Sequence, residues 1–286
     1  QQIAAEVFTN LEATQDPGAY SLFAILSGDQ TADAGVAALT AQIARMRDAP
    51  VTQAELDEAK NEIVTATIQG RETAFGRAEE LADSVIRYGN ADYADRLLAA
   101  IQATTAADVQ RVARSILSDN RRVVVRYLPE QQGVTGDTIA TSPTIQARAL
   151  NIPQSEITVF EPAPEGQREA PPAPGAPIDA RIPQTAERTL ANGLRVIVAP
   201  NRALPLISAD LRVGYGGSAD ANGRAGLAGM TADLLTRGTT TRSATQIASQ
   251  IESLGAAIGS GAGLDSSAVS LQTRSDRVND AFTVFA

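Results

Sequence analysis

The residues able to do chemistry in this sequence are carboxylates, cationic side chains and hydroxyls, because histidine and cysteine are both absent. Without histidine there is no imidazole general base, no imidazole metal ligand and no Ser-His-Asp triad. Without cysteine there are no disulfides, thiolate metal sites or thiol nucleophiles. Calcium or magnesium held by carboxylates alone remains open, although no EF-hand pattern occurs.

One acidic group stands on a predicted helix, and its members are Glu55, Asp57, Glu58 and Glu62. A solvated helix face is the favoured interpretation, and metal binding is the alternative. The pairs Arg87-Tyr88 and Arg126-Tyr127 carry groups that hydrogen-bond peptide carbonyls. Such pairs more often mark the ordinary ends of a helix and a strand.

A glycine-rich turn, Gly214-Tyr215-Gly216-Gly217, follows a predicted strand. Such a turn can form a phosphate-binding loop, but neither G-x-G-x-x-G before a helix nor the P-loop spacing is present. We therefore expect a glycine bend in which another backbone approaches closely.

Composition limits the function classes further. The chain has 286 residues, an apolar fraction of 43% and a formal charge of −9. Its acidity disfavours nucleic acid, which needs a basic surface. No apolar run reaches the roughly 20 residues that a membrane-spanning helix requires.

The first part of the chain predicts strand, turn and strand over residues 1–30, with the turn at Asp16-Pro17-Gly18, followed by helices. Start signals occur at Thr31, at Thr52 with Glu55, and at Thr105 with Asp108. Periodicity predicts two further helices, over about 72–87 and over 93–101. The valine-rich residues 121–127 predict a returning strand.

A proline-rich stretch, residues 131–184, predicts an extended linker. Beyond it we expect a hairpin over 189–198 with a type I′ turn at Asn192-Gly193. Strands at 206–213 and 266–273, helices at 226–236 and 243–255, and a last helix capped by Ser275 complete the pattern. The fold class predicted is α+β, with antiparallel-rich sheets and helices on one face.

The order of several segments resembles the insulinase/pitrilysin (inverzincin) family of zinc metallopeptidases. Two of these segments precede the linker, 51–60 (starting Val51-Thr52) and 104–113. The others follow it and are Asn192-Gly193-Leu194, Gly214 to Ser218, Gly226-Leu227-Ala228 and Arg237-Gly238-Thr239. The resemblance covers about residues 1–130 and 185–286. It implies the C-terminal domain of a first half at 1–130, a linker at 131–184, and a truncated N-terminal domain of a second half at 185–286. We expect a stretch from the middle of a longer protein.

In active family members a helix carries H-x-x-E-H, whose histidines bind zinc and whose glutamate activates the bound water. In this sequence the matching positions are Gly229, Ala232 and Asp233. The resemblance therefore implies no catalytic, cofactor-binding or metal-binding residue in this chain, with zinc expected only in the intact parent protein.

The resemblance further implies a closed peptide-degrading chamber, to which this chain contributes wall, substrate positioning and hinge. The expected partners are a peptide substrate and the other half of the chain or a homologous catalytic subunit. A scaffold or partner subunit without peptidase activity is the alternative. A bacterial, periplasmic or otherwise extracytoplasmic setting is expected.

Overall fold

The computed structural model describes residues 3–12, 18–128, 161–168, 170, 172–176 and 183–286. Contacts group Gln1–Arg126 with Asn201–Ala286 in one compact unit and place Tyr127–Pro200 in a second. The predicted turn at Asp16-Pro17 and most of the predicted linker lie outside the described residues. The three domain boundaries given above stay a prediction.

The first unit opens with an antiparallel pair of strands, β1 (Ala4–Leu11) and β2 (Tyr20–Leu26). Phe8 lies opposite Phe23, and their rings stack with centroids 4.7 Å apart. Both rings remain over 40% exposed, at 44% and 45%. A pair of strands with so little cover is marginal by itself and depends on packing against helix α1.

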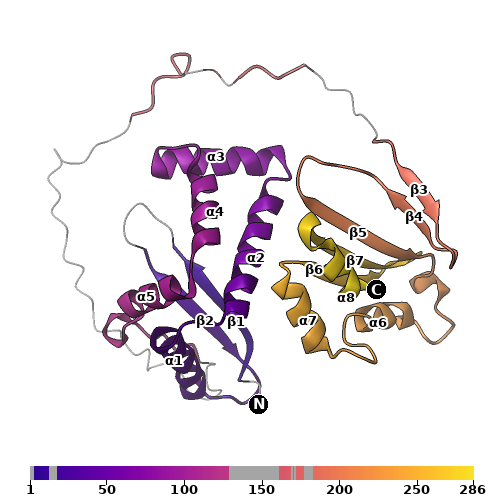
Figure 1. Cartoon of the computed structure of the whole chain (residues 1–286), viewed down its shortest axis with the longest axis horizontal. Helices are drawn as coiled ribbons and strands as arrows, with labels where there is room; N and C mark the ends of the chain where they lie inside the picture. Colours follow the sequence, from indigo (N-terminus) through magenta and orange to yellow (C-terminus); the bar gives the residue numbers. More distant parts are fainter. Residues whose placement is uncertain (1–2, 13–17, 129–160, 169, 171, 177–182) are drawn as a thin grey trace, which may run out of the picture. The chain divides into compact units, whose positions relative to one another are not determined.

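Five helices follow, and most begin at predicted start signals. They are α1 (Ala32–Asp48), α2 (Gln53–Gly70), α3 (Ala74–Tyr88), α4 (Tyr93–Ala103) and α5 (Ala106–Ile116) (Figure 1). Thr52 and Glu55 form a capping box, as do Thr105 and Asp108. These side chains satisfy amide groups that the first helical turn leaves without partners. The predicted helix starts at these two sites are confirmed.

The strand predicted at 121–127 is wrong. Asp119–Arg121 is a 3-10 turn, and the residues after it up to 128 join no strand ladder among the described residues. Arg122 donates to Thr40 Oγ1 at 3.1 Å, and Arg126 pairs with Asp33 at 2.8 Å. Both contacts hold the segment to α1 through side chains. Valine-rich composition favours a strand only where a neighbouring strand edge is available.

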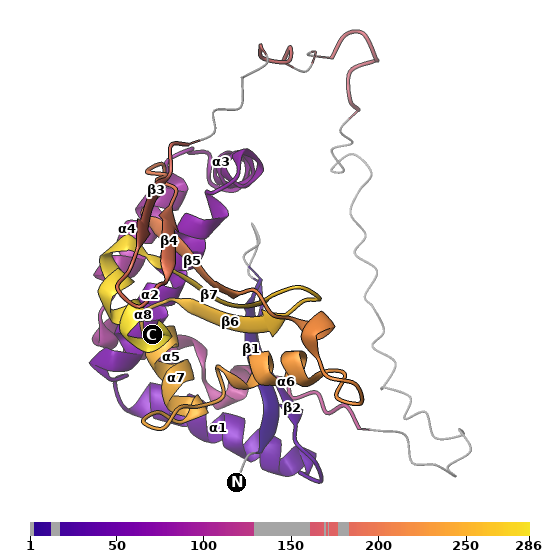
Figure 2. The same cartoon turned by 90° about the vertical axis from the view of Figure 1, so that its right-hand side faces the viewer.

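The rest of this unit is built on a three-stranded antiparallel sheet in the order β5 (Leu206–Val213), β7 (Ser267–Arg274), β6 (Ala257–Ala262). Leu271 of β7 lies opposite Ala209 and Ile258 on the neighbouring strands and is fully buried. Helices α7 (Ala244–Ser253) and α8 (Val278–Phe285) lie in the chain on either side of the pair β6 and β7 (Figure 1). Ile247, Ile251 and Ala281 from these helices form one buried cluster with Leu271 (the helices are also labelled in Figure 2). The described residues thus form an α+β fold, which confirms the predicted class.

Two details of this sheet and its helices were not anticipated. Strand β6 was missed, because its sequence Ala-Ile-Gly-Ser-Gly-Ala lacks the β-branched and aromatic residues typical of strands. The predicted cap Ser275 instead begins a 3-10 turn, Ser275–Arg277, and α8 starts after Arg277. Strand β5 and helix α7 match their predicted positions, and Ser243 caps α7 in a capping box with Gln246.

The second unit contains the predicted hairpin, formed by β3 (Ala186–Thr189) and β4 (Arg195–Val198). The predicted type I′ turn is wrong. That turn needs positive φ at Asn192, whereas in the described residues only glycines have positive φ. The Gly193 amide donates to Leu190 O at 2.9 Å, and Gly193 has φ +86°. This is the three-residue loop that closes with a left-handed glycine.

Candidate functional site

The three positions that match the family's zinc motif all lie on helix α6 (Leu227–Leu234). A Cβ placed on Gly229 would meet nothing within 4 Å, Ala232 is 1% exposed, and Asp233 is exposed. A hydrogen atom and a methyl group cannot ligate a metal, and one carboxylate does not make a zinc site. These residues do not fit zinc. Among the described residues, no group of three or more His, Cys, Asp or Glu side chains is placed to hold a metal ion.

Helix α6 is nevertheless held in place by specific contacts. The Asp220 carboxylate accepts hydrogen bonds from the amides of Gly226 at 2.7 Å and Ala228 at 3.0 Å. These are amides at the start of the helix, where a negative charge is also favoured by the helix dipole. Gly226 has φ +95°, a conformation that glycine adopts without strain.

The glycine-rich turn before α6 is joined to the loop between β6 and β7. The amides of Gly217 and Ser218 donate to the carbonyls of Gly263 and Leu264, each at 2.9 Å. A Cβ on Gly216 would lie 2.5 Å from Leu264 O, so only glycine fits there. The expected glycine bend is confirmed. Since the Gly217 and Ser218 amides already have acceptors, they are not free to bind phosphate.

A shallow cavity of about 420 Å³ opens beside α6. It is lined by Gly217, Asp220, Ala225, Gly226, Gly229, Ala262, Gly263 and Leu264. Small residues predominate, and Ala262 is the last residue of β6. In the described part of the chain β6 pairs only with β7, so its outer edge has no strand partner. An unpaired edge next to a cavity is an arrangement that can receive an extended peptide.

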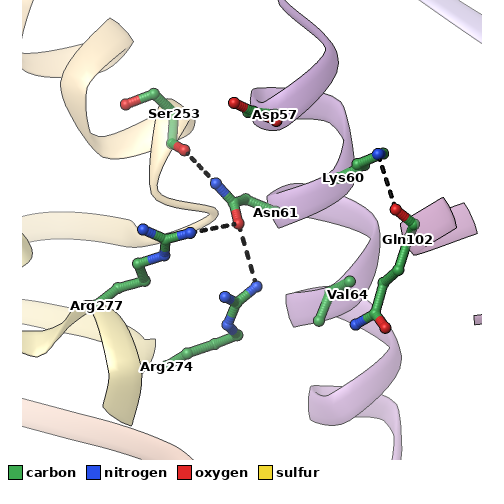
Figure 3. Close-up of a pocket in the computed structure, with 8 residues that line it drawn as sticks. All are labelled: Asp57, Lys60, Asn61, Val64, Gln102, Ser253, Arg274 and Arg277. Atoms are coloured by element: carbon green, nitrogen blue, oxygen red, sulfur yellow. Dashed lines mark hydrogen bonds between the residues drawn. The ribbon is translucent and has the colours of Figure 1, made fainter. Parts of the chain in front are cut away.

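A second, more polar cavity of about 500 Å³ lies between α2 and the β7–α8 connection (Figure 3). Its lining consists of Asp57, Lys60, Asn61, Val64, Gln102, Ser253, Arg274 and Arg277. Asn61 stands at its centre. Its Nδ2 donates to Ser253 O at 2.8 Å, and its Oδ1 accepts from Arg274 at 3.3 Å and Arg277 at 3.4 Å. One side chain of α2 therefore contacts the end of α7 and both arginines.

Beside this polar cavity, α2 approaches the end of α7 so closely that residue 255 has no room for a side chain. Gly255, just after α7, has φ +60°, and a Cβ there would lie 2.8 Å from Thr65 Oγ1 and nearer still to the Asn61 carbonyl. Thr65 is 3% exposed. Helix α2 thus packs directly on the backbone that ends α7.

Charges at the polar cavity are unevenly matched. Arg274 donates two hydrogen bonds to Asp276, at 2.9 and 2.7 Å, and this holds the pKa of Asp276 below its usual value. Lys60 donates to the carbonyl of Gln102 at 2.8 Å. The Nε of Arg277 is buried without a hydrogen-bond acceptor, and its nearest carboxylate oxygen, on Asp276, is 3.8 Å away.

The acidic residues of α2 do not converge on one point. Glu55 accepts from the Thr52 amide and from Arg45, both at 2.8 Å, and chiefly the Arg45 contact lowers its pKa from 4.5 to about 2. Asp57 accepts from Gln53 at 2.7 Å. The solvated, locally paired face is therefore the better interpretation of this group.

The two Arg-Tyr pairs have structural partners. Arg87 pairs with Asp83 at 2.6 Å, and Tyr88 stacks on Tyr93 at the end of α3. Arg126 pairs with Asp33, and Tyr127 is 99% exposed. Arg87 and Tyr88 thus make contacts at the end of a helix, and Arg126 makes one at the end of the described segment. Tyr127 is exposed.

The polar cavity around Asn61 was not predicted from the sequence. Its residues come from α2, α4, α7, β7 and the following turn, and no local pattern links them. The one available signal was Gly255 directly after a capped helix, which favours a left-handed end but does not indicate what packs there.

The described residues define an α+β protein with antiparallel sheets. Among solved structures, the chain is similar to a peptidase M16 inactive domain from Pseudomonas fluorescens, with 31% identity, a TM-score of 0.34, and coverage of 36% of this chain and 25% of that one. A protease from Helicobacter pylori matches with 21% identity, a TM-score of 0.34 and the same two coverages, 36% and 25%.

The periplasmic protease PqqL from Escherichia coli matches with 12% identity and a TM-score of 0.32, over 99% of this chain and 33% of that one. The chain thus spans between 25% and 33% of the lengths of these three structures. No protein-family model matches the chain. No curated protein matches it. No helix in the described ranges is long and apolar enough to cross a membrane.

Proposed function

We propose that this chain is a non-catalytic section of an insulinase-type zinc metallopeptidase, in which it helps to hold extended peptide for cleavage elsewhere. The observation that carries the proposal is an ordered frame around α6 that lacks the side chains of a zinc site. Asp220 positions the helix and the glycine turn joins the 263–264 loop, while Gly229, Ala232 and Asp233 stand at the positions that match the family's ligands and base.

The proposed peptide site is the outer edge of β6 together with the adjacent small-residue cavity. An extended peptide pairs with an open strand edge through backbone hydrogen bonds, and its side chains enter neighbouring pockets. Gly229 leaves the cavity open at the position where an active relative would carry a zinc ligand. In this proposal zinc and catalysis belong to another half of the parent protein, in a periplasmic or other extracytoplasmic compartment.

Filling the cavity tests this function. Gly229→Phe projects a ring into the cavity, and nothing within 4 Å opposes the first added carbon. We expect the 286-residue chain to bind a fluorescent extended apolar peptide in anisotropy measurements, and Gly229→Phe to weaken binding by about tenfold or more. Thr231→Phe adds the same ring at an exposed position of α6 and serves as the matched control.

Unchanged peptide affinity in folded Gly229→Phe would refute binding at this cavity. The same peptide incubated with the wild-type chain should remain uncleaved. An upstream sequence without H-x-x-E-H would instead favour the alternative, a scaffold or partner subunit with no peptidase activity.

A further inference from the structure

The valine segment, residues 122–128, is an extended strand without a neighbouring strand among the described residues. It begins with extended backbone angles at Arg122, φ −114° and ψ 147°. Exposure then alternates from residue to residue, at 90% for Val123, 47% for Val124 and 83% for Val125. A period of two is that of a β-strand with one covered and one open face. The segment therefore has the geometry of a strand although it has no partner.

The backbone of the valine segment is open to pairing. Within the described part of the chain, none of its amides or carbonyls bonds to another backbone group. Side chains hold it instead, since Arg122 donates to Thr40 and Arg126 pairs with Asp33, both on α1. The face that carries Val123 and its alternate neighbours is left exposed. Unpaired strands with an apolar face are templates for a strand from another molecule.

We propose that the valine segment pairs with the same segment of a second copy of this chain, antiparallel and centred on Val125. In this register Val125 lies opposite its own counterpart, and Val123 lies opposite Tyr127. All three are more than four-fifths exposed and lie on one face, so the open faces of the two copies join into one apolar strip. Such a contact is isologous, because the same residues serve on both sides of a twofold axis. Pairing here is independent of peptide binding at β6.

Charge selects this register over its two nearest alternatives. Centring on Val124 would put Arg122 opposite Arg126, and centring on Arg126 would put two Arg126 side chains opposite each other. Like charges directly opposite each other destabilise a strand pair. Centring on Val125 instead sets Arg126 opposite Val124 and Arg122 opposite Leu128. One strand from each copy makes a small interface, so we expect a dissociation constant above about 1 μM.

Disulfide cross-linking tests the pairing in the full 286-residue chain, which has no cysteine of its own. Opposed residues of antiparallel strands have Cα atoms about 4.5–5.5 Å apart, within reach of a disulfide. Val125→Cys should therefore form a covalent dimer under mild oxidation. Val123→Cys is the matched control, because residue 123 is at least as exposed but lies roughly 14 Å along the strand from its counterpart. We expect it to cross-link at least about tenfold more slowly by itself, and to cross-link readily when mixed with Tyr127→Cys.

Sedimentation velocity provides a second measurement that needs no cross-link. Between about 10 μM and 1 mM, the wild-type chain should change from monomer to dimer. Val125→Lys places two ammonium groups opposite each other and should weaken dimerisation by about tenfold or more, with unchanged circular dichroism. Val213→Lys alters another exposed valine, at the end of β5, and should dimerise like the wild type. A wild type that stays monomeric, dimerisation insensitive to Val125→Lys, or equal cross-linking at positions 123 and 125 overturns the proposed pairing.

Discussion

Asn61 of α2 donates its side-chain amide to the backbone carbonyl of Ser253, 2.8 Å away and 192 positions further along the chain. The accepting carbonyl belongs to the last residue of α7. Carbonyls at helix ends lack partners within the helix, so this one contact satisfies a group that the helix itself leaves open. Several consequences of this and the neighbouring contacts can be measured.

Asn61→Ala should lower the free energy of unfolding by about 1–3 kcal/mol, because the Ser253 carbonyl loses its donor and two arginines lose a shared acceptor. Urea denaturation of the whole chain measures the change. Asn222→Ala, at an exposed position, is the control and should stay close to wild type. Equal stability of both variants would mean that the Asn61 contacts contribute nothing.

Gly255→Ala and Gly89→Ala separate two costs of adding a methyl group. Gly89 has φ +67° and open space around it, so its replacement should cost only the left-handed strain of about 1–2 kcal/mol. Gly255 has a similar φ of +60°, but its new Cβ also meets the Asn61 carbonyl and Thr65. We expect Gly255→Ala to cost about 1–3 kcal/mol more than Gly89→Ala in the same denaturation measurement. Equal costs would show that α2 does not approach this closely.

Replacing Asp220 by alanine should speed amide hydrogen exchange in α6, whereas replacing Asp233 by alanine should not. Asp220→Ala removes the acceptor for two amides at the start of α6, with an expected loss of about 1 kcal/mol and faster amide hydrogen exchange in that helix. Asp233 lies near the C-terminal end of α6, where a negative charge opposes the helix dipole. Asp233→Ala should therefore leave the exchange unchanged or slow it. Faster exchange in both variants would contradict the capping role of Asp220.

The Glu55 capping box should make stability depend on pH in the acid range. The pKa of Glu55 is lowered from 4.5 to about 2 on folding, mainly by Arg45, so the folded state releases its proton more readily. Its stabilising contribution is complete above about pH 4.5 and is lost as pH falls toward 2. The stability difference between wild type and Glu55→Gln should shrink over that interval. Glu58→Gln, which changes a carboxylate outside the capping box, is the control, and a pH-independent difference for Glu55→Gln would contradict the assignment.

Zinc binding should be absent from the wild-type chain and gained by Gly229→His combined with Asp233→His. Two imidazoles one helical turn apart can share a zinc ion. Competition with a chromogenic chelator should show zinc uptake by the double variant, weaker uptake by Gly229→His alone and none by the wild type. Tight one-to-one zinc in the wild type would instead disprove the view that these positions are non-ligating.

The helix starts and the excluded chemistry were determined by the sequence itself. Thr52 with Glu55, Thr105 with Asp108, and Ser243 act within a single turn, so their capping is a local property that sequence reveals directly. The absence of histidine and cysteine is likewise a fact of sequence. The glycine bend at Gly216 could also be predicted, because glycine at such a position indicates that another backbone approaches too closely for a side chain.

Tertiary structure decided what depends on neighbours far along the chain. Strand β6 forms from small residues because β7 offers a matching edge, whereas the valine-rich residues after Arg121 find no such edge among the described residues. Gly193 closes a three-residue loop because the strand register places Leu190 opposite Leu194. The cavity around Asn61 brings together α2 and residues beyond position 250, a juxtaposition that no local propensity encodes. Propensity governs a residue's own backbone, but packing and pairing are settled only where distant segments meet.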